Sequence, residues 1–182
     1  GHPILRKVAV EIDKDYPKLN QLISDLFETM YYSEGLGLAA PQIGKSIRMF
    51  VIDGKPAAED EPALAEFKKV FINAHIIEKG GDLQPMTEGC LSIPGLRDEV
   101  VRESRSRINY YDENWEYHDE VHEGYKARII QHEYDHLDGI LFTDKVSPLR
   151  KRLIKSKLTA ISKGKFEADY KTILPGQKIK SA

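Results

Sequence analysis

Two histidines and a glutamate in one short run have the types and spacing needed to hold and use a metal ion. The three residues are His132, Glu133 and His136. On a helix, residues four apart project from the same face, so both imidazoles could bind one divalent ion. The glutamate would then lie beside the ion and could take a proton from a water molecule held there. The spacing predicts hydrolysis; the alternative is two solvated histidines on a helix surface.

The single cysteine of the chain, Cys90, is a candidate for the third ligand. A catalytic zinc-like site has three protein ligands and one open position, and Cys90 with the two histidines makes three. One cysteine cannot form an internal disulfide. The alternative for Cys90 is a small buried side chain. Other candidate ligands are Asp and Glu residues, His75, His118 and His122.

The elements that must position these residues mix helical and extended patterns. Apolar residues recur at helical spacing from Leu19 to Tyr31, with Pro17 suited to the first turn and Gly35 to the end. The strand-like runs are 47–52, 70–77, 107–111 and 115–121. Residues 124–137 form the expected metal-binding helix. We therefore expect an α+β fold.

Three further segments complete an expected single catalytic domain over residues 1–182. Residues 53–69 are polar, contain two prolines, and predict a surface insertion loop with a short helix near 63–67. Residues 147–165 predict a basic amphipathic helix whose apolar stripe is Leu149, Leu153, Ile154, Leu158 and Ile161. Residues 166–182 form a tail.

A second pair of histidines four apart, His118 and His122, lies in a strand-like run. Positions i and i+4 of a strand are about 13 Å apart, which is too far for one metal ion. We therefore interpret this pair as a solvated strand end.

The composition fits a compact enzyme of the cytoplasm. Hydrophobic residues make up 41% and charged residues 31%, as in ordinary soluble proteins. The net charge of −2 gives no reason to expect DNA binding. No apolar run is long enough for a membrane span, no signal-peptide core is present, and one cysteine suits a reducing compartment.

Three motifs together resemble those of the peptide deformylases. The motifs are Gly35–Gln42 (GLGLAAPQ), Glu88–Ser92 (EGCLS) and Gln131–Gly139 (QHEYDHLDG). Their order and approximate spacing also agree, and the resemblance extends from Gly1 to about Pro148. Family members usually carry several residues before the segment that matches Gly1, so we expect the natural start to lie upstream. Many members also have a shorter connection in place of residues 53–69.

The resemblance implies a metal-dependent hydrolase that removes the N-formyl group from the initiator methionine of new polypeptides. It implies that Cys90, His132 and His136 hold the metal and that Glu133 transfers the proton. It assigns the stabilisation of the oxyanion to the Gln42 side chain and the backbone N–H of Leu91.

The resemblance also implies a substrate cleft. Leu36 and Gly37 line it, and Gly89 pairs with the substrate main chain in the manner of an added β-strand. Arg97 flanks the cleft and meets the peptide beyond its first residue; a surface arginine is the alternative. We expect Leu36 and Ile129 to form the methionine pocket, since Ile129 lies one turn before the metal-binding histidines. Glu88 and Asp135 are unranked candidates to accept the second N–H of a ligand histidine.

The thiolate suits Fe(II), zinc and other late divalent ions. The family implies Fe(II) in the cell, with Zn, Ni or Co accepted in the purified protein. The partners implied are N-formylmethionyl nascent peptides, and nothing demands more than a monomer. The basic residues of 147–165 favour a solvated helix face over docking to ribosomal RNA.

Three alternatives stay open from the sequence. A zinc endopeptidase would use the same His-Glu-His run, although such enzymes more often take a downstream His or Glu as third ligand. A binding module with a structural metal would need a fourth protein ligand and would tolerate the loss of Glu133. A deformylase fold with altered substrate specificity is the third.

Overall fold

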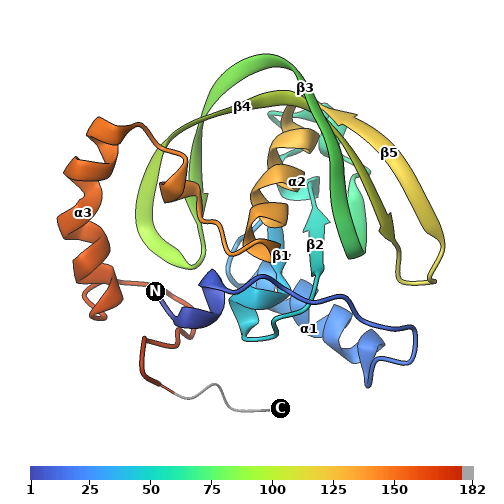
Figure 1. Cartoon of the computed structure of the whole chain (residues 1–182), viewed down its shortest axis with the longest axis horizontal. Coiled ribbons are helices and arrows are strands. Elements are labelled where there is room, and N and C mark those ends of the chain that lie inside the picture. Colours follow the sequence, from blue (N-terminus) through green and yellow to red (C-terminus); the bar gives the residue numbers. More distant parts are fainter. Residues whose placement is uncertain (178–182) are drawn as a thin grey trace.

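The computed structural model describes residues 1–177 and is built on one antiparallel sheet (Figure 1). In the described residues the strands lie in the order β1 (Gly37–Ala39), β2 (Met49–Asp53), β3 (Lys68–Cys90), β4 (Ile93–Tyr111) and β5 (Tyr117–Glu123). The α-helices there are α1 (Leu19–Tyr32), α2 (Gly124–Leu137) and α3 (Pro148–Ser162). Short 3-10 turns are Pro3–Arg6, Ala40–Ile43, Lys55–Ala57, Pro62–Leu64 and Phe142–Asp144. The predicted α+β class is confirmed.

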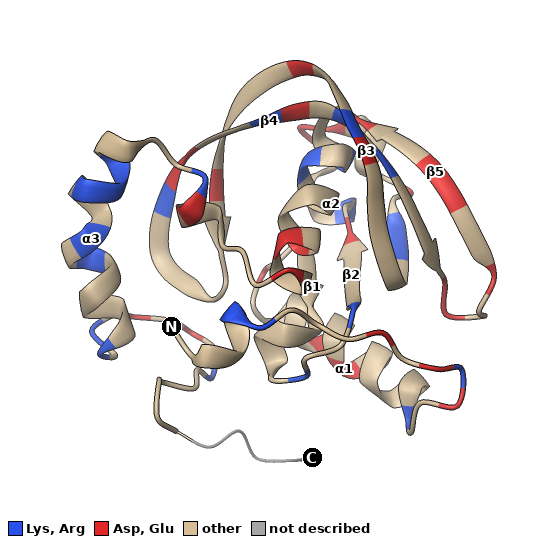
Figure 2. Cartoon of the chain, in the orientation of Figure 1, with Lys and Arg blue, Asp and Glu red and all other residues tan. Residues whose placement is uncertain are grey.

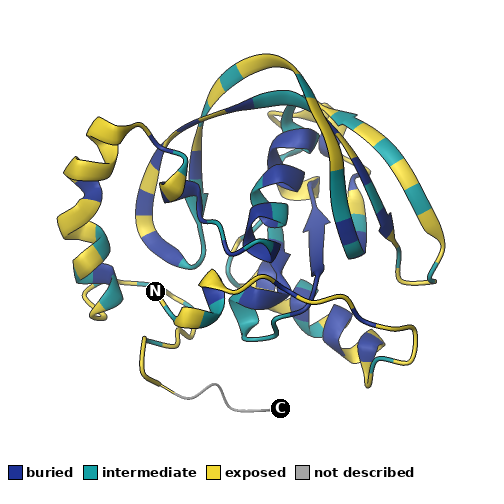
Figure 3. Cartoon of the chain, viewed as in Figure 1, coloured by how far each residue is buried: buried dark blue, intermediate teal, exposed yellow. Residues whose placement is uncertain are grey.

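Helix α2 lies at the centre of the molecule, under the arch that β3 and β4 form together (Figure 1). The register of this pair shifts at several points, and such bulges bend a strand. Nine of the 14 residues of α2 are buried, and the helix is dark blue over most of its length in Figure 3. Its apolar face packs against a cluster that includes Phe50, Phe71 and Ile108. The predicted bounds of the metal-binding helix are confirmed.

Helix α1 leads the chain into β1 and buries Leu19, Leu22, Ile23, Leu26 and Met30, as the periodicity predicted. The residues expected at the start and at the end of this helix, Pro17 and Gly35, do not have the expected positions. Lys18, directly before the helix, has a left-handed backbone (φ 55°). The helix therefore begins at Leu19, and Pro17 lies outside its first turn. At the other end the left-handed residue is Glu34 (φ 56°), not Gly35.

The predicted runs 70–77 and 107–111 are only parts of the longer strands β3 and β4. The segment 78–90 includes Gly80, Gly81 and Pro85, residues that weaken strand patterns. It forms a strand because β4 pairs along its whole length. Strand pairing between distant segments overrode the local preference.

The insertion 53–69 is fixed to the core by Leu64 and Phe67, whose exposed fractions are 0% and 4%. It contains two 3-10 helices, Lys55–Ala57 and Pro62–Leu64, and the second overlaps only the start of the short helix expected near 63–67. In α3 the predicted apolar stripe is only partly correct. Ile154 and Ile161 are buried, whereas Leu149 and Leu153 are 66% and 61% exposed.

The histidine pair on β5 is not a solvated strand end. His118 Nε2 lies 2.8 Å from an Asp112 carboxylate oxygen, and His122 Nε2 lies 2.9 Å from one of Glu120. The His122 side chain is only 10% exposed and its ring lies against Phe67, so the insertion covers this part of the strand. None of the described helices is both long and apolar enough to cross a membrane.

Candidate active site

The end of β3 and one face of α2 bring together three side chains that could bind a metal ion. One donor atom each from Cys90, His132 and His136 lie within 4.8 Å of one another. Cys90 Sγ and His136 Nε2 are 3.3 Å apart. Burial opposes ionisation of the Cys90 thiol, but the two imidazoles outweigh it and hold its pKa well below the usual range. A ready thiolate beside two imidazoles is a donor set that fits a late divalent ion.

Glu88 orients one of the two histidines. His132 Nδ1 lies 2.8 Å from Glu88 Oε2, which leaves Nε2 of the ring free to face the other donors. Asp135, the other candidate for this role, instead accepts a hydrogen bond from Arg102 at 2.6 Å. Of the two candidates that the sequence left unranked, Glu88 is therefore the one that contacts the second ring nitrogen of His132. Among the described residues, His136 Nδ1 has no hydrogen-bond partner.

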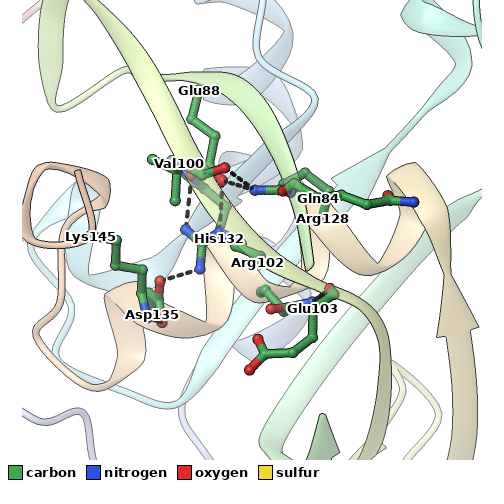
Figure 4. A network of polar contacts seen from close by, with 10 residues as sticks. Gln84, Glu88, Val100, Arg102, Glu103, Arg128, His132, Asp135 and Lys145 are labelled. Carbon is green, nitrogen blue, oxygen red and sulfur yellow. Dashed lines mark hydrogen bonds and ion pairs between the residues drawn. The ribbon is translucent and has the colours of Figure 1, made fainter. Parts of the chain in front are cut away.

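Two buried arginines hold Glu88 in place (Figure 4). Arg102 donates two hydrogen bonds to the carboxylate, at 2.6 and 2.9 Å, and Arg128 donates a third at 2.9 Å. Arg128 also donates to the Val100 carbonyl at 2.9 Å. Burial would raise the pKa of Glu88, but the bonds from Arg102 and His132 hold it well below its usual range. The carboxylate therefore stays charged and fixed.

Truncating Glu88 to alanine should destabilise the protein by about 3–5 kcal/mol, because the buried Arg102 and Arg128 lose three hydrogen bonds to the carboxylate and Arg128 is left with backbone carbonyls only. A matched control is the Glu78–Arg105 pair on the same two strands, where both side chains are about half exposed. Its truncation, Glu78→Ala, should cost less than about 1 kcal/mol. Urea unfolding of both variants measures the difference. Equal free energies of unfolding for the two variants would contradict a buried network of this strength.

Glu133 lies beside the three candidate ligands and is 5% exposed. Burial raises the pKa of its carboxyl group. Its Oε2 atom has no hydrogen-bond partner within residues 1–177. A Cβ atom on Gly37 would be only 2.7 Å from Glu133 Oε1, so glycine is needed for β1 to approach the carboxylate. An unpartnered carboxylate at this point is available to a substrate or a water molecule.

Gln42 faces the same centre from the 3-10 turn after β1. Its Oε1 accepts from the Ala39 N–H at 2.8 Å, which fixes the orientation of the amide. Its Nε2 then donates toward Cys90 Sγ at 3.6 Å and Ser92 Oγ at 3.2 Å. Leu91 and Ser92 form the turn between β3 and β4. The side-chain NH₂ group of Gln42 thus points toward this turn and toward the Cys90 sulfur.

A cavity of about 530 Å³ opens onto these groups. Every residue that the sequence placed at the substrate site lines it: Leu36, Gly37, Gly89, Arg97 and Ile129. Gln42, Leu91, Glu133 and His132 line it as well.

Some residues of this site were not predicted from the sequence, among them Arg102, Arg128 and Tyr170. Arg128 lies four residues before His132, so its helical spacing could have placed it on the metal-binding face. Arg102 carried no local signal, since its contact with Glu88 depends on the register and bend of the β3–β4 pair. Tyr170, which also lines the cavity, comes from the C-terminal segment.

Comparison with known proteins agrees with this geometry. The family model described as "Polypeptide deformylase" matches residues 1–152. A peptide deformylase of Christiangramia forsetii is 54% identical over 185 residues, covering 98% of this chain and 94% of that protein.

Two solved structures are similar in fold. The peptide deformylase of Synechococcus elongatus, in complex with actinonin, is 39% identical with a TM-score of 0.77, over 90% of this chain and 84% of that one. The enzyme of Thermotoga maritima is 40% identical with a TM-score of 0.71, over 80% of this chain and 92% of that one. The chain therefore belongs to the polypeptide deformylase family, whose members remove the formyl group from nascent polypeptides.

Proposed function

We propose that this chain performs the family's reaction with Cys90, His132 and His136 as metal ligands and Glu133 as the group that transfers the proton. The observation that carries the assignment is the convergence of the three donors beside an unpartnered, buried carboxylate. Three protein donors leave one position of a tetrahedral ion open, which suits catalysis rather than a structural site. A cysteine as third ligand also disfavours the endopeptidase alternative.

The chemistry needs a nucleophile, a sink for negative charge and a proton for the leaving amine. A divalent ion, when bound, would act as a Lewis acid and lower the pKa of water to about 7. Glu133 accepts a proton from the attacking water and then delivers it to the leaving nitrogen. Its placement in the cavity, without a competing hydrogen bond, supports both steps.

Gln42 Nε2 and the backbone N–H of Leu91 stabilise the negative charge that develops on the formyl oxygen when water adds to the formyl carbon. Each such donor contributes about a hundredfold to a thousandfold in rate. The hydrogen bond from Ala39 supports this role of Gln42, because it turns the amide nitrogen toward the site before substrate arrives.

The methionine side chain occupies the part of the cavity lined by Leu36 and Ile129, and Gly89 pairs with the peptide backbone. Strand β3 pairs with β2 only through Lys68–Ile72. Around Gly89 the described strands therefore leave one edge of β3 unpaired, which supports the addition of a peptide there. Arg97, which lines the same cavity, contacts the peptide beyond its first residue.

Fe(II) is our proposal for the ion in the cell, and Zn, Ni or Co for the purified protein. The soft thiolate in the donor set supports this range of ions. We place the reaction in the cytoplasm, where formylated chains are made, and we propose a monomer with residues 1–182 as one catalytic domain.

Within residues 1–177, docking to the ribosome is supported by a basic face of α3, and we retain a solvated face as the simpler interpretation. Lys and Arg residues recur along the helix in Figure 2, and Lys151, Arg152, Lys155 and Lys157 are exposed. Ribosome co-sedimentation that survives reversal of these charges would exclude docking through this face.

Formate release from a short N-formylmethionyl peptide tests the proposed function. Anaerobic protein loaded with Fe(II) should release formate, and the same peptide without its formyl group should remain intact. Cleavage of internal peptide bonds instead would favour the endopeptidase. Folded, metal-loaded protein with neither activity would contradict a hydrolytic role.

A further inference from the structure

The chain returns to the active site after α3. The segment 163–177 runs from the end of α3 past the N-terminus (red in Figure 1). Phe166 packs against the apolar cluster shared by α3 and the start of β4. At the far end His2 Nε2 lies 3.3 Å from the Gln177 carbonyl oxygen. The segment is thus tied to the body of the protein on both sides of Tyr170.

Tyr170 links this segment to the turn between β3 and β4. Its hydroxyl donates a hydrogen bond to the Leu91 carbonyl oxygen at 2.8 Å, and its side chain lines the cavity. Burial, with a smaller contribution from Cys90, raises the pKa of Tyr170, so the hydroxyl keeps the proton that it donates. Residue 170 lies outside the residues 1–152 that the family model matches.

The turn consists of Leu91 and Ser92, since Cys90 pairs with Ile93. It is held at three points. The Leu91 side chain lies against Gly35, where a Cβ atom would be 2.9 Å from Leu91 Cδ1. Ser92 Oγ accepts from Gln42, and the Leu91 carbonyl accepts from Tyr170.

The contact at the Leu91 carbonyl bears on the direction of the Leu91 N–H group. The two groups belong to the rigid peptide units on either side of the Leu91 Cα atom. The neighbouring ligand Cys90 fixes the unit that carries the N–H, and Tyr170 fixes the unit that carries the carbonyl. When both peptide units are held, the φ and ψ angles of Leu91 are fixed, and the direction of its N–H bond is fixed with them.

We propose that Tyr170 is a positioning residue. It lies on a C-terminal segment that forms part of the cleft wall, and it holds the Leu91–Ser92 turn in place. In this way it fixes the Leu91 N–H that stabilises the oxyanion. The inference rests on the proposed function of Leu91. Other contacts from the C-terminal region reach the same hairpin farther from the turn. An example is the bond from Arg150 to Asp98 at 2.9 Å, where the Arg150 side chain is 49% exposed.

The test is Tyr170→Phe, which keeps the ring and removes the hydroxyl. We expect kcat for formate release to fall about tenfold with KM within about twofold, because a loosened donor should cost less than a deleted one. In NMR spectra of zinc-loaded protein labelled at leucine, the Leu91 amide signal should shift and its hydrogen should exchange faster with solvent.

Two controls separate positioning from stability. Tyr117→Phe removes a hydroxyl from a side chain that is 58% exposed, and Arg150→Gln removes another contact between the C-terminal region and the hairpin. Both should keep the kcat and the Leu91 signal of the parent. An active parent whose Tyr170→Phe variant keeps its kcat, even with a lower Tm, would overturn the role of Tyr170. A parent that releases no formate would instead contradict the proposed function.

Discussion

Replacing Glu133 by alanine should lower kcat for formate release by about a thousandfold or more, while the protein still folds and binds metal. The carboxylate transfers two protons in the proposed reaction, and one positioned acid or base contributes about a hundredfold to ten-thousandfold. Glu133 is not one of the three converging donors, so the metal content should not change. Its carboxylate is buried and partly unpartnered, so its removal should not lower Tm.

Glu59→Ala is the matched control, because Glu59 is exposed in the 53–69 segment. This variant should have the kcat of the parent. Formate release and metal content would be measured on all three proteins. A Glu133→Ala enzyme as fast as the parent would exclude Glu133 from proton transfer. An inactive parent with a fully occupied site would point to a structural metal.

The sequence predicted the part of the site that is local. His132 and His136 lie four residues apart on one helix, so their spacing alone places both imidazoles on one face, with Glu133 next to them in the sequence. The bounds expected for α2, residues 124–137, also agree with the structure. Cys90 was inferred by counting ligands, and the fold places it beside the two histidines.

The parts that the sequence could not predict depend on contacts between distant segments. Arg102 reaches Glu88 only because the β3–β4 pair is bent and its register is shifted by bulges. Tyr170 reaches Leu91 across 79 positions of the chain. Neither contact has a periodic or motif signal, since each is set by packing. The end of α1 differs from the expectation for a local reason, because Glu34 rather than Gly35 adopts the left-handed conformation.

Replacing Cys90 by serine should remove most of the bound metal and nearly all activity. A serine hydroxyl does not ionise near neutral pH, so the site loses its only anionic donor and keeps two imidazoles. Loss of a residue that merely supports a ligand typically costs about tenfold to a hundredfold in metal affinity. Loss of the ligand itself should therefore exceed roughly a hundredfold. The ratio of metal to protein after gel filtration, measured beside formate release, tests this.

Metal removal from the parent separates this effect from a change in packing. Chelator-treated parent should lose activity and regain it when Fe(II) is added under anaerobic conditions, whereas Cys90→Ser should not regain it at the same concentration. The metal-free forms of both proteins should remain folded, because the substitution replaces a single side-chain atom and leaves the backbone pairing of Cys90 with Ile93 unchanged. A Cys90→Ser protein that keeps its metal and its activity would show that the ion is held elsewhere. The site would then need a third donor other than Cys90, and the turn that carries Leu91 would lose its link to the metal.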